Sequence, residues 1–205
     1  MLKDERFKTV FSEFRQNYID ILNVLYPSKN STGFTERNLS VNFAKAYEQI
    51  VPTAHTWYEF QFGTKNNLHF DAIIVDAARK ELLIIESKRF SNPTKKMQEV
   101  KDDIIRINKA STVYRSEFET RINGFEHYSI YGVVLADVWT ENRNKIQIKN
   151  EFQNASILDA FSEESIISQE QLKSCLCFVE SFENRTPYEW VNTDYSLLGL
   201  VWKVS

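Results

Sequence analysis

Residues 69–90, HFDAIIVDAARKELLIIESKRF, constrain the fold of this chain more than any other part of the sequence. Two apolar runs flank the short polar segment AARK, which predicts two antiparallel strands joined by a tight turn. Pairing around that turn places Ile73 opposite Ile84, and Val75 opposite Leu82. Both faces of the hairpin are then apolar, which is typical of a sheet covered by helices on both sides. The stretch therefore predicts an α/β fold whose central sheet is flanked by helices.

The open end of the same hairpin carries charge. The register places Asp71 opposite Glu86, and Lys88 shares their face because residues two apart in a strand point the same way. Two facing carboxylates on a half-buried sheet repel, and loss of water makes the repulsion worse. Either Mg²⁺, which takes oxygen ligands, compensates them, or Lys88 alone neutralises one of them. The first arrangement suits phosphodiester hydrolysis, in which a metal activates water and a lysine stabilises developing negative charge.

The remaining elements follow from periodicity and capping signals. Apolar residues at helical spacing predict an N-terminal helix over residues 5–26 and a second helix that begins after an N-cap at Thr35. The segment SNP predicts a further helix with Pro93 in its first turn. Strands are expected at 55–62, 68–76, 81–90 and 128–139. C-terminal to these we expect helices at 142–153 and 156–161, and strands at 174–182 and 195–204.

Length and composition limit the class of protein. The 205 residues suit one domain, with a core at about 35–140, the N-terminal helix 5–26 and a C-terminal extension 141–205. No apolar run approaches the roughly 18 residues of a membrane span. The charged N-terminus MLKDERFK does not resemble a signal peptide, so a cytoplasmic protein without a membrane partner is expected. Cys175 and Cys177 are interpreted as buried free thiols rather than metal ligands.

The spacing of the charged residues resembles a known family. Asp71, fourteen intervening residues and then Glu86-Ser87-Lys88 are similar to the signature of the PD-(D/E)XK nuclease superfamily, although Phe70 replaces the proline that often precedes the aspartate. The resemblance implies a restriction-endonuclease-like αβββαβ core with a mixed sheet. It also implies Mg²⁺, with Mn²⁺ able to substitute. Asp71, Glu86 and the Ser87 carbonyl would be the metal ligands, and Lys88 the catalytic lysine.

Two further positions bear on this resemblance. Many members of the superfamily carry a glutamate on the first core helix, and Glu36 is the candidate for that catalytic position because it shares the apolar face of its helix. The alternative for Glu36 is a first-turn acid that favours the helix dipole. Glu99-Val100-Lys101 also fits the E-x-K pattern, but these residues lie on an amphipathic helix, where positions two apart point in different directions.

The charge distribution points to a partner. Net charge is −3, yet residues 88–109 hold seven basic and three acidic residues. Lys95, Lys96, Arg89 and Arg37 are the candidates for nucleic-acid binding, whereas the ordinary alternative is a solvated helix face. We expect a metal-dependent nuclease acting on nucleic acid, with DNA as the expected substrate.

Two alternatives stay open: a catalytically silent nuclease-like fold that binds nucleic acid or protein, and an interaction domain whose carboxylates only form salt bridges. No separate recognition module is visible in the sequence. The N-terminal helix and the last sixty residues are therefore expected to supply recognition, a homodimer contact, or both.

Overall fold

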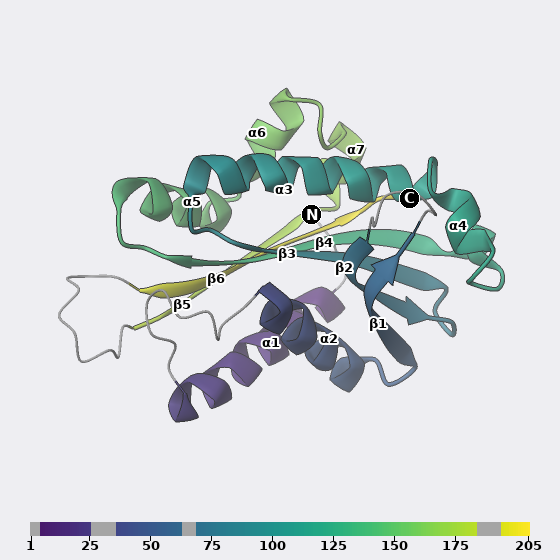
Figure 1. Ribbon diagram of the computed structural model, residues 1–205, viewed down its shortest axis with the longest axis horizontal. Helices are drawn as coiled ribbons and strands as arrows, with labels where there is room; N and C mark the ends of the chain where they lie inside the picture. Colours follow the sequence, from purple (N-terminus) through teal and green to yellow (C-terminus); the bar gives the residue numbers. More distant parts are fainter. Residues whose placement is uncertain (1–4, 26–35, 63–68, 184–193) are drawn as a thin grey trace.

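A six-stranded mixed sheet lies between two layers of helices in the computed structural model, which describes residues 5–25, 36–62, 69–183 and 194–205 (Figure 1). The strand order is β1-β2-β3-β4-β6-β5, and among these described strands only β3 and β4 are parallel neighbours. The strands are β1 (Ala54–Gln61), β2 (His69–Asp76), β3 (Glu81–Arg89), β4 (Ser129–Trp139), β5 (Leu176–Phe182) and β6 (Tyr195–Lys203). The predicted α/β class, with a mixed sheet flanked by helices, is confirmed.

The helices divide between the two faces of the sheet. One face is covered by α1 (Glu5–Val24) and α2 (Glu36–Ile50), and the long α3 (Pro93–Asn108) crosses the other face (Figure 1). With α3 lie α4 (Arg115–Glu119), α5 (Arg143–Gln153), α6 (Ile157–Glu163) and α7 (Gln169–Lys173), and two 3₁₀ turns, Lys109–Ser111 and Phe125–His127, flank α4. Because parallel strands need a crossover connection, α3 joins β3 to β4. The predicted order of helix, three strands, helix and strand is therefore observed in α2-β1-β2-β3-α3-β4.

The register of the β2–β3 hairpin agrees with the prediction. Ile73 pairs with Ile84 and Val75 with Leu82, and the pairing ends at Ala72 and Ile85. Asp71 and Glu86 occupy the next position, where β2 stops pairing with β3. On its other side β3 stays paired with β4 as far as Arg89. The end of β3 is therefore held by backbone pairing with β4, whereas its backbone is not paired with β2 there.

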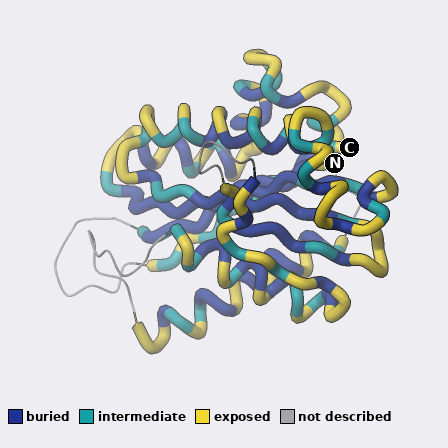
Figure 2. The backbone as a smooth tube through the Cα atoms, turned by 45° about the vertical axis from the view of Figure 1, so that its right-hand side comes forward, coloured by how far each residue is buried: buried dark blue, intermediate teal, exposed yellow. Residues whose placement is uncertain are grey.

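Two hydrophobic cores lie on the two faces of this sheet. Figure 2 shows that the residues of its central strands are mostly buried. Alternate residues of β3 enter different cores: Ile84 joins the core under α3, whereas Ile85 joins the core under α1 and α2. Glu86 and Lys88 continue the α3 face. Ser87 continues the other face, where its hydroxyl lies 2.7 Å from that of Ser40 on α2.

Local signals explain the start of α3. The Asn92 side chain caps the helix by accepting a hydrogen bond from the Lys95 N–H at 3.1 Å, and Pro93 is the first helical residue, as SNP predicted. The predicted N-cap Thr35 lies outside the described residues. Within those residues, no helix is long and apolar enough to cross a membrane. Both cysteines are free, Cys175 buried and Cys177 partly so, and burial raises the pKa of each thiol to about 12.

Candidate active site

Asp71 lies at the open end of the hairpin and binds the neighbouring strand through its side chain. Its Oδ2 accepts a hydrogen bond from the Ser87 N–H at 2.7 Å, so the carboxylate continues the ladder beyond the last β2–β3 pair. Burial raises the pKa of Asp71, although the Ser87 N–H and the Lys88 charge act in the opposite direction. The side chain stays partly exposed and is therefore accessible to a ligand.

Glu86 is the most buried acid of this region, with 2% of its surface exposed. Arg106 of α3 forms a short ion pair with its Oε1, and Lys88 Nζ lies 3.9 Å from its Oε2. Burial and the nearby acids Asp103 and Asp71 raise the pKa of Glu86 to about 8, against the opposing effect of the two cations. Lys88 and Arg106 therefore do not fully offset the cost of burying the charged form of Glu86.

Asp103 of α3 completes the cluster. It is 4% exposed, and its Oδ2 lies 2.7 Å from Lys88 Nζ while its Oδ1 lies 2.8 Å from Arg106 Nη2. Burial disfavours the Lys88 ammonium, but Asp103 and Glu86 outweigh this effect and raise the pKa of Lys88. We call Asp71, Glu86, Lys88, Asp103 and Arg106 the charged cluster. Its three carboxylates face two cations.

Sequence reasoning missed Asp103 and Arg106 as members of this site. Both residues lie in the segment 88–109 and contribute to its charge, but neither belongs to the predicted site. Helical spacing contained a signal, because Asp103 follows Val100 by three residues and precedes Ile107 by four, which places it on the buried stripe of α3. An acid on such a stripe requires a partner, and the nearest charged strand end is that of β3.

Glu36 joins three elements next to the charged cluster. Its Oε1 accepts a hydrogen bond from the Arg89 N–H at 2.9 Å and lies 3.4 Å from Lys96 Nζ. These contacts connect the first turn of α2 to the end of β3 and the first turn of α3. The negative charge of Glu36 also contributes to the raised pKa of Asp71. The structure thus places Glu36 close to the predicted metal ligands, on the side facing α2.

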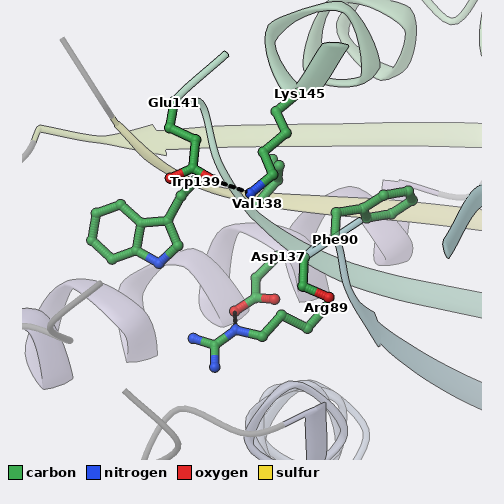
Figure 3. Close-up of a pocket in the computed structure, with 8 residues that line it drawn as sticks. Arg89, Phe90, Asp137, Val138, Trp139, Glu141 and Lys145 are labelled. Carbon is green, nitrogen blue, oxygen red and sulfur yellow. Dashed lines mark hydrogen bonds and ion pairs between the residues drawn. The ribbon is translucent and has the colours of Figure 1, made fainter. Parts of the chain in front are cut away.

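The candidate nucleic-acid-binding residues separate into two groups. Lys95, Lys96 and Arg37 lie in the first turns of α3 and α2; Lys95 and Arg37 are exposed, and Lys96 also pairs with Glu99 at 2.8 Å. Arg89 instead points away from α3. Its Nε lies 3.6 Å from Asp137 Oδ2 in a pocket of about 250 Å³ (Figure 3).

The pocket around Arg89 is a polar site distinct from the charged cluster. Tyr195 donates a hydrogen bond to Asp137 Oδ2 at 3.1 Å, and Lys145 reaches from α5 to Glu141 at the opposite side of the pocket (Figure 3). Burial raises the pKa of Asp137 to about 6, although Arg89 and Tyr195 favour its charged form. Arg89 thus has a buried carboxylate as its partner.

The oxygen donors of the charged cluster suit a hard divalent cation. Among the described residues, no group of three or more His, Cys, Asp or Glu side chains is arranged to hold a metal. Mg²⁺, however, is often held by one or two carboxylates and completes its shell with water and phosphate oxygens. Asp71 and Glu86 provide two carboxylates, and the cluster has one more acid than cations. The fit carries one condition, which is that Arg106 must release Glu86.

Comparison with known proteins gives no match: no family model, no curated protein and no solved structure is significantly similar to this chain.

Proposed function

We propose that this protein is a metal-dependent nuclease that hydrolyses phosphodiester bonds, with DNA as the expected substrate. The observation that carries the proposal is the meeting of Asp71, Glu86 and Lys88 where β2–β3 pairing ends. Asp71 binds the Ser87 N–H between the other two residues, and Lys88 lies 3.9 Å from Glu86. Two carboxylates and an ammonium at one partly exposed strand end suit a site that holds a metal and a phosphate.

Each residue has a separate role in this proposal. Asp71 and Glu86, with the Ser87 carbonyl, would hold Mg²⁺ or Mn²⁺. When bound, that ion would lower the pKa of a coordinated water and polarise a phosphoryl oxygen. Lys88 would orient the attacking water and stabilise the negative charge that grows on the phosphate in the transition state. Glu36 would add negative charge on the α2 side of the site.

Binding of the substrate backbone falls to exposed cations beside the site. Lys95 and Arg37 are exposed at the first turns of α3 and α2, and Lys96 contacts Glu36 beside them. Such cations bind phosphates without reading sequence, so they would position the substrate rather than select it. Arg89 does not share this role, because its side chain pairs with the buried Asp137.

One observation favours a second candidate function. Arg106 and Lys88 already pair with Glu86, so the cluster also has the features of a structural ion network. A protein with such a network would bind nucleic acid or another protein through the same fold without cutting. Metal binding and cleavage distinguish the two candidates.

The test combines Mn²⁺-induced thermal stabilisation with nicking of supercoiled DNA on the same preparations. A ligand that binds only the folded state raises Tm by mass action, so Mn²⁺ should raise the Tm of the wild type. Asp71→Asn should abolish both this shift and the nicking. Lys88→Ala should keep the shift but cut more slowly by about 10²-fold or more, because it removes an electrostatic stabiliser of the transition state.

Asp102→Asn is the matched control for Asp71→Asn, because Asp102 is an exposed acid on the outer side of α3. It should respond to Mn²⁺ and nick DNA like the wild type. An equal Mn²⁺ response in the wild type and Asp71→Asn would refute the metal site. A metal response that depends on Asp71, without nicking of DNA or RNA, would favour the silent binding module.

A further inference from the structure

We infer that Arg106 is a built-in counter-cation for Glu86, which pairs with this carboxylate and must be displaced when a divalent metal binds. The inference rests on the proposed function and deepens it, because it assigns a regulatory role to a residue outside the family-like signature. It makes metal binding an exchange of one cation for another instead of the filling of a preformed site.

The contacts of Glu86 support this exchange. The carboxylate is 2% exposed, so water cannot compensate its charge, and Arg106 binds its Oε1 directly. A metal held by Asp71 and Glu86 needs oxygen lone pairs of the same carboxylate. The guanidinium and the metal are both positive, and in a site with little water their mutual repulsion is strong. Close contact of both cations with Glu86 is therefore unfavourable.

The charges of the cluster lead to the same conclusion. With all three acids ionised, as metal binding requires of its ligands, Asp71, Glu86 and Asp103 carry three negative charges, while Lys88 and Arg106 carry two positive ones. A divalent ion would leave the cluster with one excess positive charge if both cations stayed in place. Lys88 is held by Asp103 at 2.7 Å and only loosely by Glu86 at 3.9 Å. Arg106 is therefore the cation whose contact with Glu86 the metal replaces.

Arg106 also has a route away from Glu86. Its side chain is 26% exposed, whereas that of Glu86 is 2% exposed, so the arginine can turn towards solvent while the glutamate cannot. The guanidinium stays attached to the site after the exchange, because Asp103 holds its Nη2 at 2.8 Å. Asp103 and Arg106 are three residues apart on α3, which is the spacing of side chains that meet on one helix face. The helix therefore provides both the counter-cation and its anchor.

The experiment measures Mn²⁺ binding by isothermal titration calorimetry, without any substrate, in the wild type, Arg106→Gln and Arg106→Lys. Repulsion between the guanidinium and a divalent ion is strong in a site with little water. Removing the competing charge in Arg106→Gln should therefore tighten Mn²⁺ binding by about tenfold or more. Arg106→Lys keeps the charge but loses the guanidinium, whose Nη2 contacts both Glu86 and Asp103, so a smaller gain in Mn²⁺ affinity is expected.

Lys101→Gln is the matched control. It removes one positive charge from the same helix, but Lys101 pairs with Glu164, the residue that follows α6, and not with Glu86. Its Mn²⁺ affinity should stay near that of the wild type. Circular dichroism and Tm without metal establish that each variant folds. If Arg106→Gln does not fold, the Mn²⁺ affinity of Arg106→Lys alone tests the inference.

The outcomes separate this inference from the proposed function. Mn²⁺ binding that Asp71→Asn abolishes, without tighter binding in either Arg106 variant, would overturn the role of Arg106 and leave the metal site standing. Weaker Mn²⁺ binding in both Arg106 variants would also overturn it, because a positioning role for Arg106 predicts that loss. Absence of Asp71-dependent Mn²⁺ binding in every protein would refute the proposed function and this inference together.

Discussion

At the residue scale, two buried carboxyl groups in neighbouring strands are stabilised in different ways. Glu86 of β3 has an arginine that comes from helix α3. Asp137 of β4 has Arg89 from the neighbouring position of β3 and the hydroxyl of Tyr195 from β6. Both groups have a raised pKa because burial disfavours their charged forms. Each ionised carboxylate therefore lowers the stability of the fold relative to its protonated form.

Asp137 gives a pH-dependent prediction. Its pKa is about 6 in the fold against an ordinary value of 3.8. A raised pKa favours the neutral form in the folded state, so this contribution to stability is complete below about pH 4 and is lost as pH rises through about 6. Since one pKa unit corresponds to about 1.4 kcal/mol, the loss is roughly 2–3 kcal/mol.

The prediction is measured by urea denaturation of the wild type and Asp137→Asn between pH 4 and 7. The amide in this variant cannot ionise, so the free energy of unfolding of the wild type should fall relative to that of the variant across this range. Asp102→Asn, which changes an exposed acid, serves as the control. A wild-type-to-variant difference that does not change with pH would contradict the raised pKa.

At the element scale, β4 and β6 pack through a position where only glycine fits. A Cβ atom added to Gly132 of β4 would lie 2.2 Å from the indole ring of Trp202 on β6. The same indole donates a hydrogen bond to Asn108 Oδ1 at 2.9 Å, at the last residue of α3. Gly132 therefore allows β6 to anchor the end of the helix that carries Asp103 and Arg106.

Gly132→Ala should destabilise the protein by about 1–3 kcal/mol or more, because extra atoms in a packed core force neighbouring side chains from their positions. Chemical denaturation measures this loss. Trp202→Phe removes the clashing part of the indole, so the double variant should lose less stability than the sum of the two single variants. Strictly additive losses would show that contact with the Trp202 indole is not the reason why a larger residue destabilises position 132.

At the scale of the whole molecule, the two cores share one sheet. Phe14 of α1 lies in one core and Phe118 of α4 in the other, and both are fully buried. Strand β3 contributes alternate residues to each core, so unfolding one layer removes support from the other. We therefore expect a single domain that unfolds in one cooperative transition, although its helices lie in two separate layers.

Phe14→Ala and Phe118→Ala test this expectation. Each substitution should reduce stability by about 3–5 kcal/mol, as is usual for a buried phenylalanine. Both should shift the same single transition, followed by far-UV circular dichroism and by tryptophan fluorescence. Two transitions, each sensitive to one substitution only, would contradict a single cooperative unit.

The sequence alone determined the α/β class, the order of the core elements and the register of the β2–β3 hairpin. It did so because the two apolar runs and the length of the AARK turn between them are local properties of the chain. The same register brought Asp71, Glu86 and Lys88 to one strand end. Their grouping needed no knowledge of distant parts of the chain.

Only the tertiary structure decided which partners these charges have. The pairs of Arg106 with Glu86 and of Asp103 with Lys88 depend on how α3 is rotated and placed over the sheet. Arg89 meets Asp137 because parallel pairing puts these two residues side by side. Such contacts join residues that are distant in sequence, and a helical pattern fixes the buried face of α3 without fixing where along the sheet that face lies.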